Sequence, residues 1–456
     1  MVFSSAVFVF GFLPLVFLCY FIAPKKIKNY VLLVFSLIFY LFGGPKFILL
    51  LLSVVLINYI GALLISKFKS KIWLIVTVAL NLGLLGYFKY LDFFIRSFNR
   101  FLGTDLKVLG IVLPIGISFY VFQALSYTID VYREEVKVQK NFFLLLFYVS
   151  FFPQLVAGPI VRYKTIEEEI KSRKSSIEDI SDGVERFILG LAKKVIIANQ
   201  VGALADIIFR SSNVGSLLSL LGAIAYMLQI YFDFSAYSDM AIGIGRILGF
   251  HFLENFNFPY IASSVTDFWR RWHMSLSSFF RDYVYIPLGG NRVSKARWIF
   301  NLLVVWGLTG LWHGASWNFV LWGLYYFVFL VIEKLWLGKY LEKTHVIKHI
   351  YTLIVVLGGW IIFRCEGLRS IIAFGKDLFS FSTGDINTLL IYLETYGLYL
   401  VIGIIFSTPI YYVIKNKFND KVWFNAIKYV GLLVLFMISI CYLARSAFNP
   451  FIYFRF

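Results

Sequence analysis

The feature that most limits how this chain can fold is a long run without charged side chains. From Ile299 to Ile332 the sequence contains no Lys, Arg, Asp or Glu. A helix of about 20 apolar residues crosses the hydrocarbon core of a bilayer, where each backbone polar group must find its partner inside the helix. Comparable runs recur along the 456 residues, of which 60% are hydrophobic and 15% are charged. We therefore predict an all-α polytopic membrane protein with about 10–12 transmembrane helices, some of the helices being re-entrant or interfacial.

The positive charge of the chain carries information about its orientation. The formal net charge is +18, and the basic residues lie in short loops between apolar segments. Clusters follow the first and the third segment: Lys25, Lys26 and Lys28, then Lys67, Lys69 and Lys71. Because cytoplasmic loops carry an excess of Lys and Arg, this alternation predicts an outside N-terminus and cytoplasmic clusters. The excess of positive charge then reflects the orientation of the chain in the membrane. We therefore expect membrane lipids around the protein and no nucleic acid partner.

Polar stretches are few, which favours a single integral membrane domain over residues 1–456. The most polar insertion covers 161–186, where acidic and basic residues mix, and we expect a cytoplasmic helical segment there. The segment 251–297 departs most from a simple helix bundle, and 251–313 is the expected catalytic core. The sequence closes with an aromatic tail at 446–456.

His313 lies inside the uncharged run. An ionisable group at membrane depth is costly, and it marks a functional site by default. An imidazole titrates near neutral pH and can accept or donate a proton. Trp312 and Gly314 flank this histidine, which leaves room for a substrate beside an aromatic wall. The alternative is a structural histidine that hydrogen-bonds to a neighbouring helix.

A second histidine, His273, lies in a segment rich in aromatic and basic residues. Ser264 and Asp267 have the spacing of a helix N-cap, and Asp267 and Arg271 are i,i+4 partners. We predict one helix that begins there and ends at Pro287. Further side chains recur at helical spacing on the face of His273: Trp269, Trp272, Leu276, Phe280 and Tyr283. An amphipathic helix lying in the membrane interface is the alternative.

Two carboxylates interrupt the apolar region before this segment. Asp233 and Asp239 lie in the stretch FDFSAYSDMAIG, together with Ser235. For Asp239 we expect a structural role, either hydration at a helix end or pairing with Arg246. For Asp233 the sequence leaves that role and a place in a polar tunnel equally open.

Several common sites are missing from the sequence. It contains neither a G-x-S-x-G elbow nor an H-E-x-x-H motif, and its three cysteines lack metal-ligand spacing. Among the five histidines, His345 and His349 are an i,i+4 pair, but they lie in a basic loop, where solvation is expected rather than metal binding. We expect no metal and no bound cofactor.

A neutral imidazole that takes a proton from a hydroxyl supports acyl transfer to an alcohol. The alternative is a transporter of a polysaccharide or a lipid-linked glycan, without acyl-transfer chemistry.

Long motifs in the sequence resemble the bacterial membrane-bound O-acyltransferases. DFWRRWHMSLSSFFRDYVYIPLGGNR, followed by LTGLWHGASWNFVLWG, is similar to the signature of that family. The YIPLGGNR segment resembles the alginate O-acetylase branch in particular. VLPIGISFYVFQALSYTIDVYR, FFPQLVAGPIVRY and QIYFDFSAYSDMAIGIGRILGF also resemble this branch, so the similarity runs nearly end to end. The teichoic acid D-alanyltransferases are a related branch.

The resemblance implies a multi-pass protein of the bacterial plasma membrane, built as a helical funnel with a tunnel between the two membrane faces. His313 matches the catalytic histidine of the family, and His273 matches the second histidine of its motif. The implied donor is a cytoplasmic acyl thioester, and acetyl-CoA is the thioester expected. The implied acceptor is an extracytoplasmic polysaccharide, and the implied partner is an extracytoplasmic acetyltransferase of the SGNH-hydrolase-like type. The side chains expected to line the tunnel or to contact substrate are Asp233, Ser235, Trp269, Arg270, Trp272, Ser275, Arg281 and Trp312.

The last six residues, FIYFRF, resemble the F-x-Y-x-x-F end of a short partner peptide in D-alanylation. In that peptide the tyrosine is thought to carry the acyl group, which makes Tyr453 a candidate acyl carrier. The alternative is an aromatic tail that anchors the chain at the membrane interface.

Overall fold

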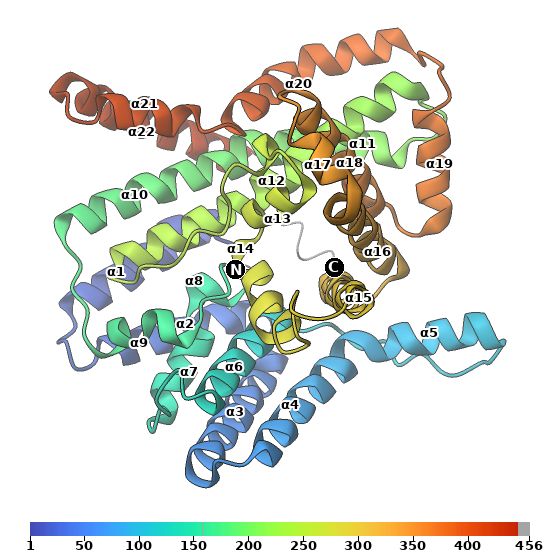
Figure 1. The fold of residues 1–456 in the computed structure, drawn as a ribbon. Coiled ribbons are helices and arrows are strands. Elements are labelled where there is room, and N and C mark those ends of the chain that lie inside the picture. Colours follow the sequence, from blue (N-terminus) through green and yellow to red (C-terminus); the bar gives the residue numbers. More distant parts are fainter. Residues whose placement is uncertain (157, 446–456) are drawn as a thin grey trace. The chain divides into compact units, whose positions relative to one another are not determined.

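The computed structural model describes residues 1–156 and 158–445, and every regular element in these ranges is a helix (Figure 1). In this described part, eight helices are long and apolar enough to cross a membrane. Two shorter apolar helices, Val7–Ile22 and Lys28–Gly43, add to them. The chain is therefore an all-α, multi-pass membrane protein. Its residues form two compact units, described separately below.

The first unit comprises Met1–Phe187 and Met240–Leu253. Its elements are η1 (Val7–Phe12), α1 (Leu13–Ile22), α2 (Lys28–Gly43), η2 (Pro45–Phe47), α3 (Ile48–Phe68), α4 (Lys71–Leu85), η3 (Gly86–Tyr90), α5 (Leu91–Leu102), α6 (Ile117–Tyr132), α7 (Phe142–Ser150), α8 (Phe152–Leu155), α9 (Tyr163–Lys171), most of α10 (Ile177–Ala192) and the end of α12 (Gly215–Ile247).

Buried polar side chains join three helices of the first unit. Asn58 of α3 donates to Oδ1 of Asn81 on α4 at 2.9 Å and accepts from the hydroxyl of Thr128 on α6 at 2.7 Å. Polar contacts of this kind link membrane helices, because lipid offers no driving force for burying apolar side chains against each other. The network therefore fixes α3, α4 and α6 against one another.

Charged side chains gather around the loop that follows α12. Arg246 pairs with Asp179 at 3.4 Å and with Asp182 at 3.1 Å. Nδ1 of His251 lies 2.8 Å from Glu169, and its Nε2 lies 3.3 Å from Asp179. These contacts tie the end of α12 to α9 and α10, inside the polar segment that the sequence marked at 161–186.

The second unit comprises Ile188–Asp239 and the chain from Glu254 onward. Its elements are the end of α10, η4 (Lys193–Ala198), α11 (Asn199–Arg210), most of α12, η5 (Pro259–Ile261), α13 (Val265–Arg271), α14 (Met274–Phe280), η6 (Arg281–Tyr285), α15 (Lys295–His313), α16 (Trp317–Ile332), η7 (Glu333–Leu337), α17 (Gly338–Leu341), α18 (Ile347–Arg364), α19 (Leu368–Leu378), α20 (Ile386–Phe406), α21 (Ile410–Phe418) and α22 (Val422–Arg445).

The uncharged run of the sequence forms a helical hairpin, in which α15 packs along α16 (Figure 1). Glycines allow the two backbones to come close. A Cβ on Gly310 would lie 2.4 Å from the carbonyl oxygen of Phe319, and one on Gly323 would lie 2.3 Å from that of Trp306. Small residues at such crossings are typical of membrane helix pairs. The hairpin turns at 314–316, directly after His313.

The apolar side chains of α20 and α22 are mostly exposed. Leu398, Val401, Leu433 and Val434, for example, are each more than half exposed. Exposed apolar surface on a helix that is long enough to cross a membrane is suited to contact with lipid tails.

Candidate active site

His313 is the last residue of α15, and its side chain is buried, at 5% exposure. Its Nδ1 lies 2.7 Å from the carbonyl oxygen of Thr309, one helical turn earlier. Because a carbonyl oxygen only accepts hydrogen bonds, Nδ1 must carry the hydrogen and donate it. The lone pair of the neutral ring is then on Nε2, which is the nitrogen that can take a proton.

His273 lies between the short helices α13 and α14 and is almost completely buried. Its φ of 43° is a left-handed conformation that costs energy in a residue with a Cβ. Asn255 supports this conformation, because its Oδ1 accepts from the hydroxyl of Ser275 at 2.9 Å and from the backbone nitrogen of Ser275 at 3.2 Å. Nδ1 of His273 lies 3.2 Å from the same oxygen. The amide oxygen accepts, so Nδ1 donates here too, and the lone pair is on Nε2.

The prediction of one continuous helix through this segment is wrong. A helix does begin at Ser264, whose hydroxyl accepts from the backbone nitrogen of Asp267 at 2.9 Å. The predicted contact of Asp267 with Arg271 is present at 2.9 Å. The helix ends at Arg271, however, because the backbone of Trp272 is extended and that of His273 is left-handed. The aromatic stripe is therefore divided between two short helices.

Aromatic side chains connect the two histidines. The ring of Trp312 is centred 5.7 Å from that of His273 and 5.0 Å from that of His313. Trp322 and Phe363 lie 4.7 and 5.5 Å from the His313 ring. All three aromatic side chains are buried. An enclosure of this kind excludes water, which limits hydrolysis of a reactive acyl group and strengthens the electrostatic interactions within it.

The predicted lining residues of this segment fall into two groups. Trp269 and Trp272 are buried in the aromatic cluster. The hydroxyl of Ser275 donates to Oδ1 of Asn255, the same oxygen that accepts from Nδ1 of His273. Arg270 and Arg281 are exposed instead, and Arg281 pairs with the carboxylate of its neighbour in the chain at 2.6 Å. The structure thus places Trp269, Trp272 and Ser275 in the buried region of the two histidines and leaves Arg270 and Arg281 outside the enclosure.

Two carboxylates of α12 pair with consecutive lysines of η4. Asp233 lies 2.5 Å from Nζ of Lys194, and the two side chains are only 1% and 3% exposed. Asp239 lies 2.7 Å from Nζ of Lys193. The predicted pairing of Asp239 with Arg246 is wrong, because Arg246 is engaged by the carboxylates of α10 described above.

The residues that follow Asp233 reach the site. The ring of Phe234 is centred 4.6 Å from that of His273 and meets it edge-on at 87°. Ser235, a predicted lining residue, is buried. The ion pair of Asp233 thus fixes the turn of α12 that packs against His273.

Sequence reasoning missed three residues of the site: Asn255, Phe363 and Glu333. The Glu333 carboxylate accepts from the backbone nitrogens of Val265 at 2.6 Å and Thr266 at 3.0 Å. It therefore caps the positive end of α13 and links this helix to the end of α16. A carboxylate at the end of an apolar run was the only signal for it in the sequence.

Among residues 1–156 and 158–445, no three His, Cys, Asp or Glu side chains are arranged to hold a metal ion. Tyr453 lies outside the described residues.

Comparisons with known proteins identify the family of the chain. Residues 132–371, which include both histidines, match the sequence model of the membrane-bound O-acyltransferase family. The chain is 38% identical to the probable alginate O-acetylase of Azotobacter vinelandii over the whole of both chains. It is 35% identical to the peptidoglycan O-acetyltransferase of Helicobacter pylori over 81% of this chain and 78% of that one. It is 31% identical to the teichoic acid D-alanyltransferase of Bacillus subtilis over 50% of this chain and 61% of that one. With two buried histidines inside the matched region of a helical membrane protein, the chain belongs to the membrane-bound O-acyltransferase family.

Proposed function

We propose that this protein is an O-acetyltransferase that moves an acetyl group from a cytoplasmic thioester, acetyl-CoA, across the membrane for O-acetylation of an extracytoplasmic polysaccharide. The relatives support the acetyl group and the polysaccharide, since two of them are named for acetylation of alginate and of peptidoglycan. The two buried imidazoles, each of which donates a hydrogen bond from Nδ1, support the chemistry.

His313 is the general base in this proposal. Its Nε2 takes the proton of an acceptor hydroxyl while the oxygen attacks the carbonyl carbon of the thioester. The new C–O bond forms, the C–S bond breaks, and the proton passes to the leaving sulfur. The products are an acetyl ester and a free thiol, so no further reactant is needed. The observation that carries the proposal is the Nδ1 contact with Thr309, because it leaves the lone pair on Nε2 in a water-poor enclosure.

We assign His273 to the acceptor side of the reaction, where it orders the incoming hydroxyl. Its contact with Asn255 supports a fixed ring orientation. Trp269, Trp272 and Ser275 are proposed to shape this part of the tunnel.

The distribution of positive charge supports the direction of transfer. α16 and α18 are joined through a segment that carries Lys334, Lys339 and Lys343, which favours the cytoplasm. The opposite ends of these helices, at Trp317 and Arg364, then face outward. His313 precedes Trp317 by one short turn, so it belongs to the outward half of the hairpin in this orientation.

Tyr453 is proposed to carry the acetyl group to the outer face, where an SGNH-hydrolase-like partner passes it to the polymer. The phenolic oxygen would attack the thioester as described above, and its proton would go to Nε2 of His313. The motif at the end of the sequence supports this step, and the residue itself lies outside the described part of the chain.

Turnover of labelled acetyl-CoA by the purified full-length protein tests the function. His313→Ala should lower the rate by about 10²–10⁴-fold, the usual contribution of a general base. His345→Ala is the matched control, because His345 is an exposed histidine of a loop. A His313→Ala rate near that of the wild type would refute the base assignment. A transporter without acyl-transfer chemistry would consume no acetyl-CoA in any variant.

Mass spectrometry of the C-terminal peptide tests the carrier. After incubation with acetyl-CoA the wild type should carry an added acetyl group on this peptide. Tyr453→Phe removes only the hydroxyl, so the acetyl group should be absent there, and it should never form in His313→Ala. An unmodified tail in a preparation that acetylates glycan would exclude Tyr453 as the carrier.

A further inference from the structure

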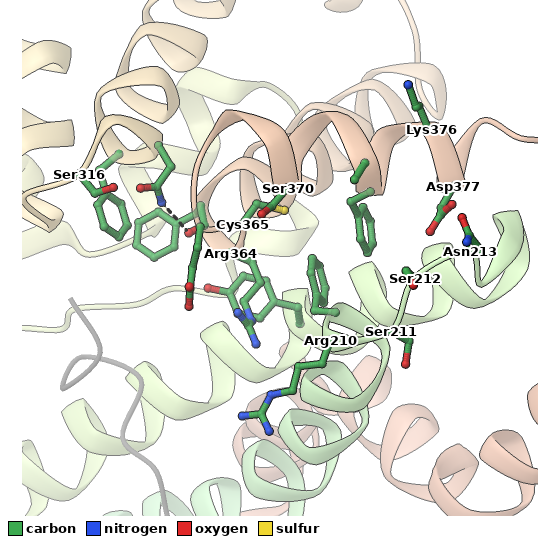
Figure 2. Close-up of a pocket in the computed structure, with 18 residues that line it drawn as sticks. Arg210, Ser211, Ser212, Asn213, Ser316, Arg364, Cys365, Ser370, Lys376 and Asp377 are labelled. Carbon is green, nitrogen blue, oxygen red and sulfur yellow. Dashed lines mark hydrogen bonds between the residues drawn. The ribbon is translucent and has the colours of Figure 1, made fainter. Parts of the chain in front are cut away.

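A large pocket lies beside the His313 enclosure, within the second unit. It has a volume of about 1060 Å³, which is the size of a pocket for a substantial organic ligand. Figure 2 shows the end of α11 and the loop after it on one side, with Ser211, Ser212 and Asn213, and α19 on the other, with Ser370, Lys376 and Asp377. The pocket is absent from the sequence-based expectations, because its walls come from segments more than a hundred residues apart.

The lining combines uncharged hydrogen-bonding groups with aromatic rings. Seven neutral side chains with hydroxyl or amide groups contribute to it: Ser211, Ser212, Asn213, Tyr226, Ser316, Asn318 and Ser370. Phe209 and Phe374 stack face to face at 4.3 Å and form an apolar wall. A sugar ring presents hydroxyl groups at its edge and C–H groups on its faces. Hydroxyl and amide side chains serve the edge, and aromatic rings serve the faces.

The charges around the pocket are balanced. Arg364 pairs with Asp206 at 2.7 Å, and Arg210 lies 3.9 Å from the same residue. The remaining charged side chains of the lining are Lys376, Glu366 and Asp377. Three cations therefore stand beside three carboxylates, counting Asp206. A site for a polyanion has a clear excess of positive charge, so this balance favours an uncharged ligand.

A thin aromatic partition separates the pocket from the proposed base. Phe363 lines the pocket and also packs against the His313 ring at 5.5 Å. The side-chain amide of Asn318 donates to the carbonyl oxygen of Phe363 at 3.3 Å, which holds this part of the wall (Figure 2). Phe319 packs against Phe363 at 4.9 Å and completes the partition. A group bound in the pocket is thus one layer of side chains from His313.

We propose that this pocket binds an uncharged saccharide segment of the acceptor polymer. The inference rests on the proposed function, and on the orientation that places Arg364 and Trp317 at the outer ends of their helices. It adds a site for the polymer on the membrane protein itself, beside the point where the acetyl group emerges. It also specifies a chemistry, neutral and rich in hydroxyl groups, that differs from a polymer of uronic acids.

Binding of short oligosaccharides to the full-length protein in nanodiscs tests the chemistry. The probes are chitotetraose, which is uncharged, and tetramannuronate, which carries four carboxylates. We expect saturable binding of chitotetraose and binding of tetramannuronate that is weaker by about tenfold or more, because its carboxylates would lose water in a pocket that has no excess of positive charge to compensate them. Preferred binding of tetramannuronate, or binding of neither probe, would overturn the proposal. Binding of a partner protein at this pocket without saccharide binding would overturn it as well.

Blocking the pocket after folding tests its location. Ser370→Cys is exposed at the rim, and a biotin-maleimide added to the folded protein would fill the entrance. Thr383→Cys is the matched control, because Thr383 is exposed and lies outside the lining. Modification should abolish chitotetraose binding in the first variant and leave it unchanged in the second. Equal binding in both would exclude this pocket as the site.

The two proposals fail separately. A wild-type protein that consumes acetyl-CoA but binds no saccharide would refute the pocket assignment alone. A wild-type protein that consumes no acetyl-CoA would refute the proposed function, whatever it binds.

Discussion

Replacing Lys194 by methionine is expected to destabilise the second unit strongly. The substitution keeps the length of the side chain and removes the charge that faces Asp233 at 2.5 Å. Because the two side chains are only 3% and 1% exposed, water cannot solvate the carboxylate that remains. Breaking a buried ion pair from one side costs about 3–5 kcal/mol. The unfolding equilibrium should shift by roughly two to four orders of magnitude.

The neighbouring pair provides an internal control. Lys193 and Asp239 are 23% and 10% exposed, so water can still reach the carboxylate that remains, and Lys193→Met should cost less than Lys194→Met. The double variant Lys194→Met/Asp233→Leu removes both buried charges and should recover most of the lost stability.

Unfolding of each purified variant in detergent micelles by increasing SDS, followed by tryptophan fluorescence, measures these differences. The reasoning fails if Lys194→Met costs no more than Lys193→Met. It also fails if the double variant is as unstable as Lys194→Met alone, because an unpaired charge would then not be the cause.

Three further perturbations test the supports of the site and of the first unit. Glu333→Gln should cost about 2–4 kcal/mol in the same unfolding assay. The carboxylate receives three hydrogen bonds, each worth about 1.5–3 kcal/mol, whereas the amide keeps only one acceptor oxygen. A loss below roughly 0.5 kcal/mol, which is typical of a substitution at an exposed position, would contradict the capping role. Asn255→Asp places a carboxylate beside Nδ1 of His273, which favours the protonated ring. The acidic limb of the rate–pH profile should therefore move to higher pH. An acidic limb at the same pH as in the wild type would argue against this contact. Burial lowers the pKa of His251, but hydrogen bonds and charges of two carboxylates outweigh it, and the pKa is raised above its ordinary value of 6.5. Its contribution to stability is then complete below the unfolded-state pKa and is lost as pH rises through the folded-state pKa. The difference in melting temperature between wild type and His251→Gln should therefore shrink as the pH rises above the ordinary pKa of 6.5. A difference that stays constant over this rise would refute the linkage.

Local patterns in the sequence were sufficient for much of the fold. The apolar runs predicted membrane helices, and eight helices of suitable length and hydropathy occur in the described part of the chain. The N-cap at Ser264 and the contact of Asp267 with Arg271 depend only on neighbours within one helical turn, and both are present. The break of the hairpin directly after His313 also follows a local signal, the small residues at 314–316.

Contacts between distant segments could not be predicted in this way. The left-handed backbone of His273 depends on Asn255, which lies 18 residues earlier, and no helical periodicity records that contact. The cap of α13 by Glu333 joins residues 68 positions apart. The partner of Asp239 was misassigned for the same reason, since a nearby arginine in the sequence was engaged elsewhere in space.

The π-helical segment η4 has a consequence for how this protein tolerates insertions and deletions. A π-turn contains one residue more than an α-turn, and that residue rotates everything after it by about 100° around the helix axis. Asp206 lies about two turns further along and reaches Arg364 at 2.7 Å. Deleting Ile196 would leave a well-bonded α-helix but would turn Asp206 away from its arginine. Apolar replacements of Ile196 preserve this register, so the number of residues in η4 is more tightly constrained than their identity.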